Sequence, residues 1–257
     1  MDGLSLRRRI ALDIARSMRK SQEEEHPLRQ LFWECTLRCN LRCQHCGSDC
    51  KQVAATPDMP KEDFFKVLDS IAAKTDPHKV FVIISGGEPT MRADLEECGK
   101  GIYSRGFPWG MVTNGFGMTA ERFSRLLGAG LHSMTVSLDG LEENHDWLRG
   151  REGSFTRAAE TIRMAVRSGI AFDVVTCVNR RNYSQLPQLK EFLIGLGLKE
   201  WRLFSIFPQG RAALNPDLQL PPEMFRGMLD FIKETRKEGR IKAVMVAKAS
   251  SALMRVM

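Results

Sequence analysis

The chain has 257 residues, of which 43% are hydrophobic, so it can bury a sizeable core as one large domain. It contains no run of eighteen apolar residues, and its first twenty residues lack the apolar segment of a signal peptide, which argues against membrane insertion and export. An odd number of cysteines, seven, favours reduced thiols or metal ligation over disulfides, and therefore a cytoplasmic protein.

The formal net charge of +7 raises nucleic-acid binding as one hypothesis, because clustered Lys and Arg attract phosphate. From Arg226 to Met257, however, eight basic residues face three acidic ones, so five of the seven excess charges belong to the last 32 residues. A solvated basic surface is the favoured interpretation. We therefore expect no nucleic-acid partner.

The first 29 residues form a predicted N-terminal helical extension. Leu6, Ile10, Ile14 and Met18 recur every four positions, which is typical of an amphipathic helix. Such a helix is expected to cover one end of the domain. Contact with a membrane surface is the weaker alternative, because the acidic run 23–25 follows at once.

Beyond this extension, six predicted strands alternate with six predicted helices. The strands are expected at 30–34, 80–84, 110–113, 133–138, 172–178 and 202–207, and the helices near 60–71, 95–102, 119–127, 155–168, 186–196 and 222–237. The run 80–84 is continuously apolar, as in a parallel strand that is buried on both faces. Six βα units in series predict an α/β fold, either an open doubly wound sheet or a partial barrel.

Polar residues or glycines follow the carboxyl end of every predicted strand. They are Cys39 to Cys46, Gly86 to Pro89, Asn114, Ser137 with Asp139, Asn179, and Gln209 with Arg211. In a barrel, the loops at this end form the active-site face, and contributions from all six strands favour a barrel over a single crevice. We predict a partial (β/α)6 TIM-like barrel over residues 30–240, followed by a tail, 241–257, of uncertain structure.

Five of the seven cysteines fall within sixteen positions, directly after the first predicted strand. Cys39, Cys43 and Cys46 have the spacing C-x3-C-x2-C, which suits three corners of an iron-sulfur cube with the fourth corner open. A zinc ion is the alternative, with Cys35, Cys50 or His45 as its fourth ligand, and it would make the protein a binding module. Cys98 and Cys177 lie on a predicted helix and strand and are expected to be core residues.

The order of five motifs, WECTLRCNLRCQHC, GGEP, TNG, SLDG and RG-x-x-GSF, resembles the radical S-adenosylmethionine (SAM) superfamily. It is most similar to the branch with a cysteine-rich SPASM extension, whose members often modify peptides or proteins. The resemblance implies a partial barrel, and a [4Fe-4S] cluster on Cys39, Cys43 and Cys46 whose remaining iron is chelated by SAM. This chain departs from the SPASM pattern because no cysteine follows Cys177, so no auxiliary cluster is expected.

The resemblance also implies a set of SAM contacts. Gly86, Gly87 and Glu88 match the motif for the amino group of SAM, and His45 takes the place of an aromatic residue near the adenine. Ser137 and Arg149 match positions that bind the ribose hydroxyls and the carboxylate.

Several of these residues have alternative interpretations. For Asn114, a further candidate contact, the alternative is a left-handed turn. Asp139 is either a SAM contact or a helix N-cap, and the alternative for Arg149 is a surface ion pair. Arg211 can steer an anionic substrate group or lie in solvent.

The implied reaction is the reductive cleavage of SAM to a 5′-deoxyadenosyl radical, which takes hydrogen from a substrate. A peptide or protein is the expected substrate, and a small molecule of cofactor biosynthesis is the alternative. The resemblance further implies an electron donor of the flavodoxin or ferredoxin type.

Overall fold

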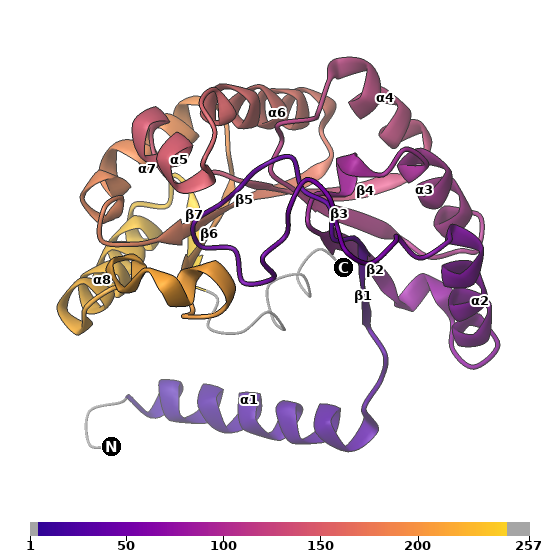
Figure 1. Cartoon of the computed structure of the whole chain (residues 1–257). Helices are drawn as coiled ribbons and strands as arrows, with labels where there is room; N and C mark the ends of the chain where they lie inside the picture. The colour runs from indigo at the N-terminus through magenta and orange to yellow at the C-terminus, as the bar shows by residue number, and fades with distance from the viewer. Residues whose placement is uncertain (1–4, 246–257) are drawn as a thin grey trace.

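The computed structural model describes residues 5–245, and Figure 1 shows how their helices surround a curved sheet. The strands are β1 (Gln30–Thr36), β2 (Phe81–Gly86), β3 (Trp109–Thr113), β4 (Leu131–Ser137), β5 (Ala171–Val178), β6 (Glu200–Ser205) and β7 (Lys242–Met245). Every neighbouring pair is parallel, and the order in the sheet is the order in the sequence. The sheet leaves β1 and β7 at its two edges, so the barrel is partial.

Helices follow the strands along the chain and cover the outer face of the sheet (Figure 1). They are α2 (Lys61–Ala72), α3 (Leu95–Tyr103), α4 (Ala120–Gly128), α5 (Glu142–Arg149), α6 (Ser154–Ser168), α7 (Leu186–Gly195) and α8 (Pro222–Glu238), whereas α1 (Leu6–Glu25) precedes the first strand. Together with the parallel sheet, they confirm the predicted α/β partial barrel with an N-terminal helix.

The main hydrophobic core lies between the sheet and its helices. Ile84 on β2 is aligned with Trp33 on β1 and with Met111 on β3, and all three side chains are buried. Trp33 stacks on Phe64 of α2 with 3.9 Å between the ring centroids, which fixes β1 against its helix just before the cysteine loop. Burial of such large aromatic side chains stabilises this end of the sheet.

The sheet contains one strand more than the six that were predicted. β7 pairs in register with β6, and Ala243 at its centre is buried, as is Ile241 just before it. The strand is only four residues long, which is too short for a period-two pattern to stand out in a sequence. The predicted boundary at residue 240 therefore falls just before a strand of the same sheet, while residues 246–257 of the predicted tail lie outside the described part.

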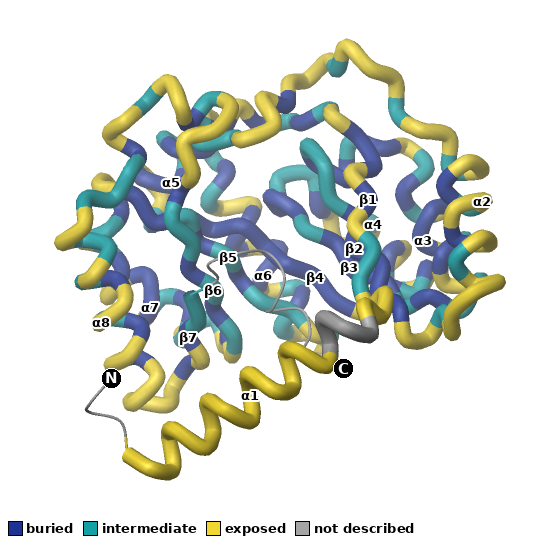
Figure 2. Tube along the Cα trace, turned by 90° about the horizontal axis from the view of Figure 1, so that it is seen from below, coloured by how far each residue is buried: buried dark blue, intermediate teal, exposed yellow. Residues whose placement is uncertain are grey.

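Helix α1 forms as predicted, but it does not cover the barrel. Every side chain described from Leu6 to Ser21 is exposed, and Figure 2 shows the helix as an exposed rod beside the buried strands. Leu6 is 74% exposed and Met18 is 60% exposed. The four-residue spacing predicted an apolar stripe correctly, but a stripe does not reveal what lies against it. Within residues 5–245, no helix combines the length and the apolar character that crossing a bilayer requires.

Candidate active site

The cysteine loop leaves β1 and is fixed to the barrel by backbone hydrogen bonds. The Cys39 amide donates to the Lys51 carbonyl at 2.7 Å, which closes the loop on itself. The Gln44 amide donates to the Leu148 carbonyl at 2.8 Å, and the Arg42 amide donates to the Arg149 carbonyl at 3.2 Å. The last carbonyls of α5 therefore find partners in the loop, as buried helix ends require.

All ten residues that the sequence assigned to the metal and SAM sites line one cavity of about 240 Å³. They are Cys39, Cys43, His45, Cys46, Gly86, Gly87, Glu88, Asn114, Ser137 and Arg149. The cavity lies at the carboxyl ends of β1 to β4, where a barrel places its active site. Cys50 and Arg211 line it too, whereas Asn179 does not and instead closes a turn by accepting a bond from the Arg181 amide at 2.9 Å.

The two glycines of the GGEP motif let the chain pass close to the cysteine loop. A Cβ on Gly86, whose φ is +128°, would lie 2.2 Å from the Thr36 carbonyl oxygen, and one on Gly87 would lie 2.3 Å from that of Arg38. The amides of Gly87 and Glu88 donate to these same two oxygens at 2.7 and 2.9 Å. The motif therefore anchors the start of the cysteine loop, a role that its sequence did not reveal.

Glu88 is only 1% exposed, and its carboxylate is held from three sides. Oε1 accepts hydrogen bonds from the Thr113 hydroxyl at 2.7 Å and from the hydroxyl and amide of Thr90 at 2.8 and 3.2 Å. Oε2 accepts from the Asn114 amide at 2.7 Å. Burial raises the pKa of this carboxyl above its ordinary value, although the four hydrogen bonds oppose that shift.

Asn114 connects the end of β3 to the cysteine loop. Its Nδ2 donates to Asn40 Oδ1 at 2.8 Å and lies 3.9 Å from the sulfur of Cys39. Its Oδ1 accepts from the Phe116 amide at 2.8 Å, so the side chain also stabilises the turn that follows. Ser137 ends β4, is nearly buried and lines the same cavity.

Arg149 and Asp139 form a buried ion pair with 2.6 Å between Nη2 and Oδ2. Asp139 Oδ1 accepts from the Cys177 amide at 2.8 Å, so the carboxylate is not a helix N-cap, and the ion pair is not at the surface. Burial opposes ionisation of Asp139, but Arg149, the two histidines and the Cys177 amide together outweigh it, so the pKa of Asp139 is lowered. Arg149 Nη1 also lies 3.7 Å from the sulfur of Cys43.

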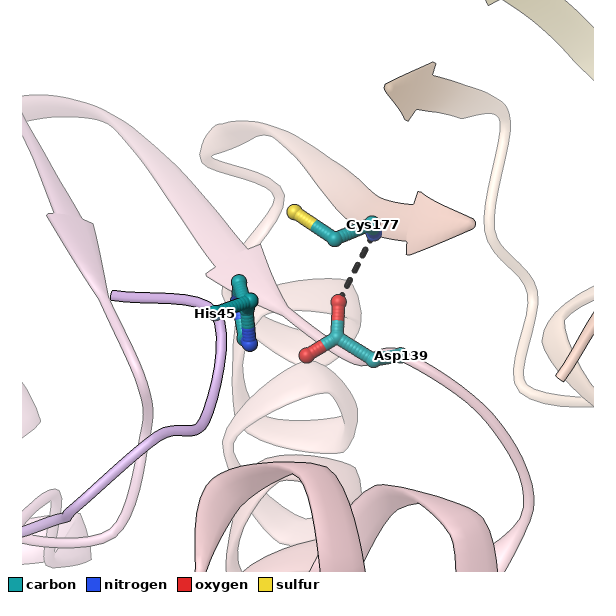
Figure 3. Close-up of side chains that lie close together, drawn as sticks. All are labelled: His45, Asp139 and Cys177. Atoms are coloured by element: carbon teal, nitrogen blue, oxygen red, sulfur yellow. Dashed lines mark hydrogen bonds between the residues drawn. The ribbon is translucent and has the colours of Figure 1, made fainter. Parts of the chain in front are cut away.

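His45, Asp139 and Cys177 meet beside this ion pair (Figure 3). Among the described residues, they are the one group of three or more His, Cys, Asp or Glu ligand atoms within 4.8 Å of one another. Burial lowers the pKa of His45 from 6.5 to about 4, so its ring is neutral near pH 7. Because Arg149 already neutralises Asp139, a second cation is disfavoured here, and of the three residues only His45 lines the cavity.

The sulfurs of the cysteine loop fit an iron-sulfur cube better than a single zinc ion. Tetrahedral zinc would hold its sulfurs about 3.8 Å apart, given a Zn–S bond of about 2.3 Å. No three loop sulfurs form such a group within residues 5–245, whereas a cube binds each sulfur through a different iron and holds them farther apart. Burial raises the pKa of Cys39 to about 12, so a bound cation is needed to deprotonate this thiol near pH 7.

Comparison with known proteins identifies the class. Residues 33–193 match the Radical SAM superfamily. The chain is 29% identical to an AdoMet-dependent heme synthase of Methanosarcina barkeri over 83% of this chain and 60% of that protein. It is 26% identical to a PqqA peptide cyclase of Rhizobium meliloti over 76% of this chain and 52% of the cyclase. The chain thus spans little more than half the length of these relatives.

The fold agrees with this match. The structure of Streptococcus suis SuiB bound to S-adenosylmethionine superposes with a TM-score of 0.68 and 15% identity, covering 97% of this chain and 58% of SuiB. The chain belongs to the radical SAM superfamily, which confirms the resemblance seen in the motifs. Its cofactors are accordingly a [4Fe-4S] cluster and SAM.

Proposed function

We propose that this protein binds a [4Fe-4S] cluster through Cys39, Cys43 and Cys46 and cleaves SAM reductively to take hydrogen from a substrate. The observation that carries the proposal is the shared cavity. Its ten predicted lining residues come from five separate stretches of sequence, and three of them are the cysteines. Such convergence of distant motifs on one cavity is what a catalytic site requires.

When bound, the cluster supplies the electron that splits SAM into methionine and a 5′-deoxyadenosyl radical, the species that removes hydrogen from the substrate. The chain contributes position and charge. Glu88, held by Thr113 and Asn114, presents a fixed acceptor to the ammonium group of SAM. Arg149 Nε is buried without a hydrogen-bond partner among the described residues, which leaves a donor for the carboxylate of SAM.

His45 and Ser137 complete the proposed SAM site. His45 Nδ1 is also buried without a partner in the described chain, and its neutral ring provides a flat wall for the adenine. Ser137 carries a hydroxyl at the end of β4 that can bond the ribose. Both assignments place the nucleoside between the cysteine loop and the carboxyl ends of the strands.

The proposed substrate is a peptide or a protein. The motif order and the similarity to a PqqA peptide cyclase support this class. A tetrapyrrole is the second candidate, and the similarity to an AdoMet-dependent heme synthase favours it. Incubating the reconstituted protein with each class and detecting new products by mass spectrometry distinguishes the two.

The reaction also needs an electron source and a reducing environment. We assign the electron to a flavodoxin or ferredoxin, because a low-potential donor is required to reduce a [4Fe-4S] cluster of this type. All seven cysteines are free thiols, which supports a cytoplasmic location.

Anaerobic reconstitution tests the proposal. We expect about four irons and four sulfides per chain, and 5′-deoxyadenosine after dithionite and SAM are added. Cys43→Ala should lose both the full iron content and the product. Cys98→Ala is the matched control, because Cys98 is buried on α3 outside the cavity. A wild-type protein that binds one zinc and yields no 5′-deoxyadenosine would refute the proposal.

A further inference from the structure

The loop after β6 lies against the cysteine loop, although some 160 residues separate the two in sequence. The Arg211 amide donates to the Cys46 carbonyl at 2.9 Å. Its guanidinium reaches further: Nε donates to the Cys43 carbonyl at 2.7 Å, and Nη1 donates to the Cys50 carbonyl at 3.0 Å. One arginine thus bonds the backbone of two proposed cluster ligands and of the next cysteine along the chain.

An ion pair adds to these contacts. Arg211 Nη1 lies 2.7 Å from Asp49 Oδ1, and the arginine side chain is only 15% exposed. Asp49 has a φ of +47°, a conformation that few residues other than glycine adopt readily. The pairing with Arg211 therefore helps to hold the turn between Cys46 and Cys50.

The preceding glycine shows how tightly the two loops approach each other. Gly210 has a φ of +59°, and a Cβ there would lie 2.4 Å from the Gly47 carbonyl oxygen and 2.5 Å from that of Cys46. Any side chain at this position would push the loops apart. In the sequence QGR, Gly210 thus permits the close contact of the two loops, and Arg211 fixes it.

These contacts give Arg211 a role that differs from steering an anionic substrate. Two of its three guanidinium nitrogens are already bonded within the cysteine loop. Other segments hold the first part of that loop: Leu148 and Arg149 accept its amides, and Arg151 donates to the Asn40 carbonyl at 2.9 Å. The part from Cys46 to Cys50 is tied to the barrel by Arg211.

We propose that Arg211 is a positioning residue that holds the ligands Cys43 and Cys46 in place from the opposite side of the barrel. The inference rests on the proposed function, because it takes Cys43 and Cys46 as cluster ligands. A guanidinium fork holds several carbonyls in one geometry, whereas an ammonium group is a single point donor. The geometry of the fork, and not the charge alone, then determines how well the cluster is retained.

The test compares Arg211→Gln and Arg211→Lys with the wild type after anaerobic reconstitution. We expect the rate of iron loss to an external chelator to rise about tenfold or more in Arg211→Gln, the size of effect that residues supporting metal ligands usually have. In Arg211→Lys, the rate of iron loss should lie between the rates of the wild type and of Arg211→Gln. The electron paramagnetic resonance spectrum of the reduced cluster should become broader in both variants, because the sulfurs are less well fixed.

The matched control is Arg180→Gln. Arg180 lies in a loop at the same end of the barrel and bonds the Gln219 carbonyl at 3.1 Å, but it does not line the cavity. Its variant should keep wild-type iron retention and spectrum. Thermal unfolding of the cluster-free proteins should show Arg211→Gln within a few degrees of the control.

Each outcome is decisive. Wild-type iron retention and an unchanged spectrum in Arg211→Gln would overturn the role of Arg211 and leave the proposed function intact. A wild-type protein that takes up no cluster would refute the proposed function and this inference together. Should Arg211→Gln fail to fold, Asp49→Asn removes the negative charge of one partner of the same arginine and weakens that contact on the exposed side of the loop. It should then increase iron loss less strongly, and unchanged retention would again overturn the inference.

Discussion

Asp139 is a fully buried carboxylate, and its surroundings explain why it stays ionised. Arg149 pairs with it, and the backbone amide of Asp139 donates to His145 Nδ1 at 3.0 Å. That bond requires an unprotonated Nδ1, and burial lowers the pKa of His145 from 6.5 to about 4. The stability of this corner of the barrel therefore depends on a histidine that must remain neutral.

The lowered pKa of His145 determines how the stability of the fold changes with pH. In the unfolded chain His145 takes up its proton near pH 6.5, and in the folded chain only near pH 4, so the unfolded state binds more protons in between. Its contribution to stability is complete above pH 6.5 and is lost as the pH falls toward 4. By pH 5 the loss should reach about 2 kcal/mol.

Urea unfolding of the cluster-free protein at pH 7 and pH 5 measures this loss. His145→Gln should unfold more easily at pH 7 but lose less stability on acidification. Part of the pH dependence should remain in the variant, because the pKa of His45 is lowered in the same way. If the stability of the wild type and of His145→Gln depended on pH in the same way, His145 would not take up a proton when the chain unfolds.

At this scale, the residues of the cavity were predictable from the sequence, but their partners were not. The order of the motifs at strand ends places ten residues at one end of a barrel. The ion pair of Arg149 with Asp139 and the contacts of Arg211 depend on how individual side chains cross between loops. Sequence spacing carries no information on such crossings, so Arg211 was interpreted as a substrate contact or a solvated residue.

Among the elements, α1 contributes least to the packing of the barrel. Its described side chains are all exposed, and exposed side chains contribute little to stability. Removing residues 1–27 should therefore change the free energy of unfolding of the remaining chain by no more than about 0.5 kcal/mol. Chemical denaturation followed by tryptophan fluorescence measures the difference.

The control for this truncation is Leu68→Ala on α2. Leu68 is fully buried in the main core, and its loss should cost roughly 2–5 kcal/mol. A comparable loss on removing α1 would show that the helix packs against the barrel in solution.

The elements that the sequence missed are short or polar. α5 contains only two large apolar residues, Trp147 and Leu148, so it lacks the periodic stripe that revealed the other helices. One of its charged residues instead serves the site, since Arg149 lies in its last turn and lines the cavity. β7 was missed because a strand of four residues is too short for its alternation to be recognised.

For the molecule as a whole, β7 completes the sheet beside β6. Ile241 and Ala243 are buried, Ala243 is aligned with Trp201 on β6, and a chain ending at Gly239 would lack both buried side chains. Burying an isoleucine side chain stabilises a protein by roughly 1.5–3 kcal/mol. We expect the chain ending at Gly239 to be less stable than one ending at Met245 by about 3 kcal/mol.

Thermal or urea unfolding of these two truncated chains isolates the contribution of β7, because the longer one retains it and both lack the residues beyond. Equal stability of the two truncated chains would show that the sheet is as stable with β6 as its edge strand. The fold class needed no such detail to be predicted, because alternating strands and helices already determine a parallel sheet. The exact edge of that sheet depends on a few buried side chains.

The order of the strands has a consequence for how the protein is made. Each strand pairs with the one synthesised just before it, so the sheet can grow along one edge as the chain emerges from the ribosome. The contacts of the cysteine loop with Arg211 form later, because Cys50 precedes its partner Arg211 by 161 residues. At 5–20 residues per second, roughly ten to thirty seconds pass between the two. If Arg211 holds the cluster ligands as proposed, iron delivered during that interval would reach a cysteine loop that lacks its Arg211 contacts, and we expect stable cluster assembly only at the end of translation or later.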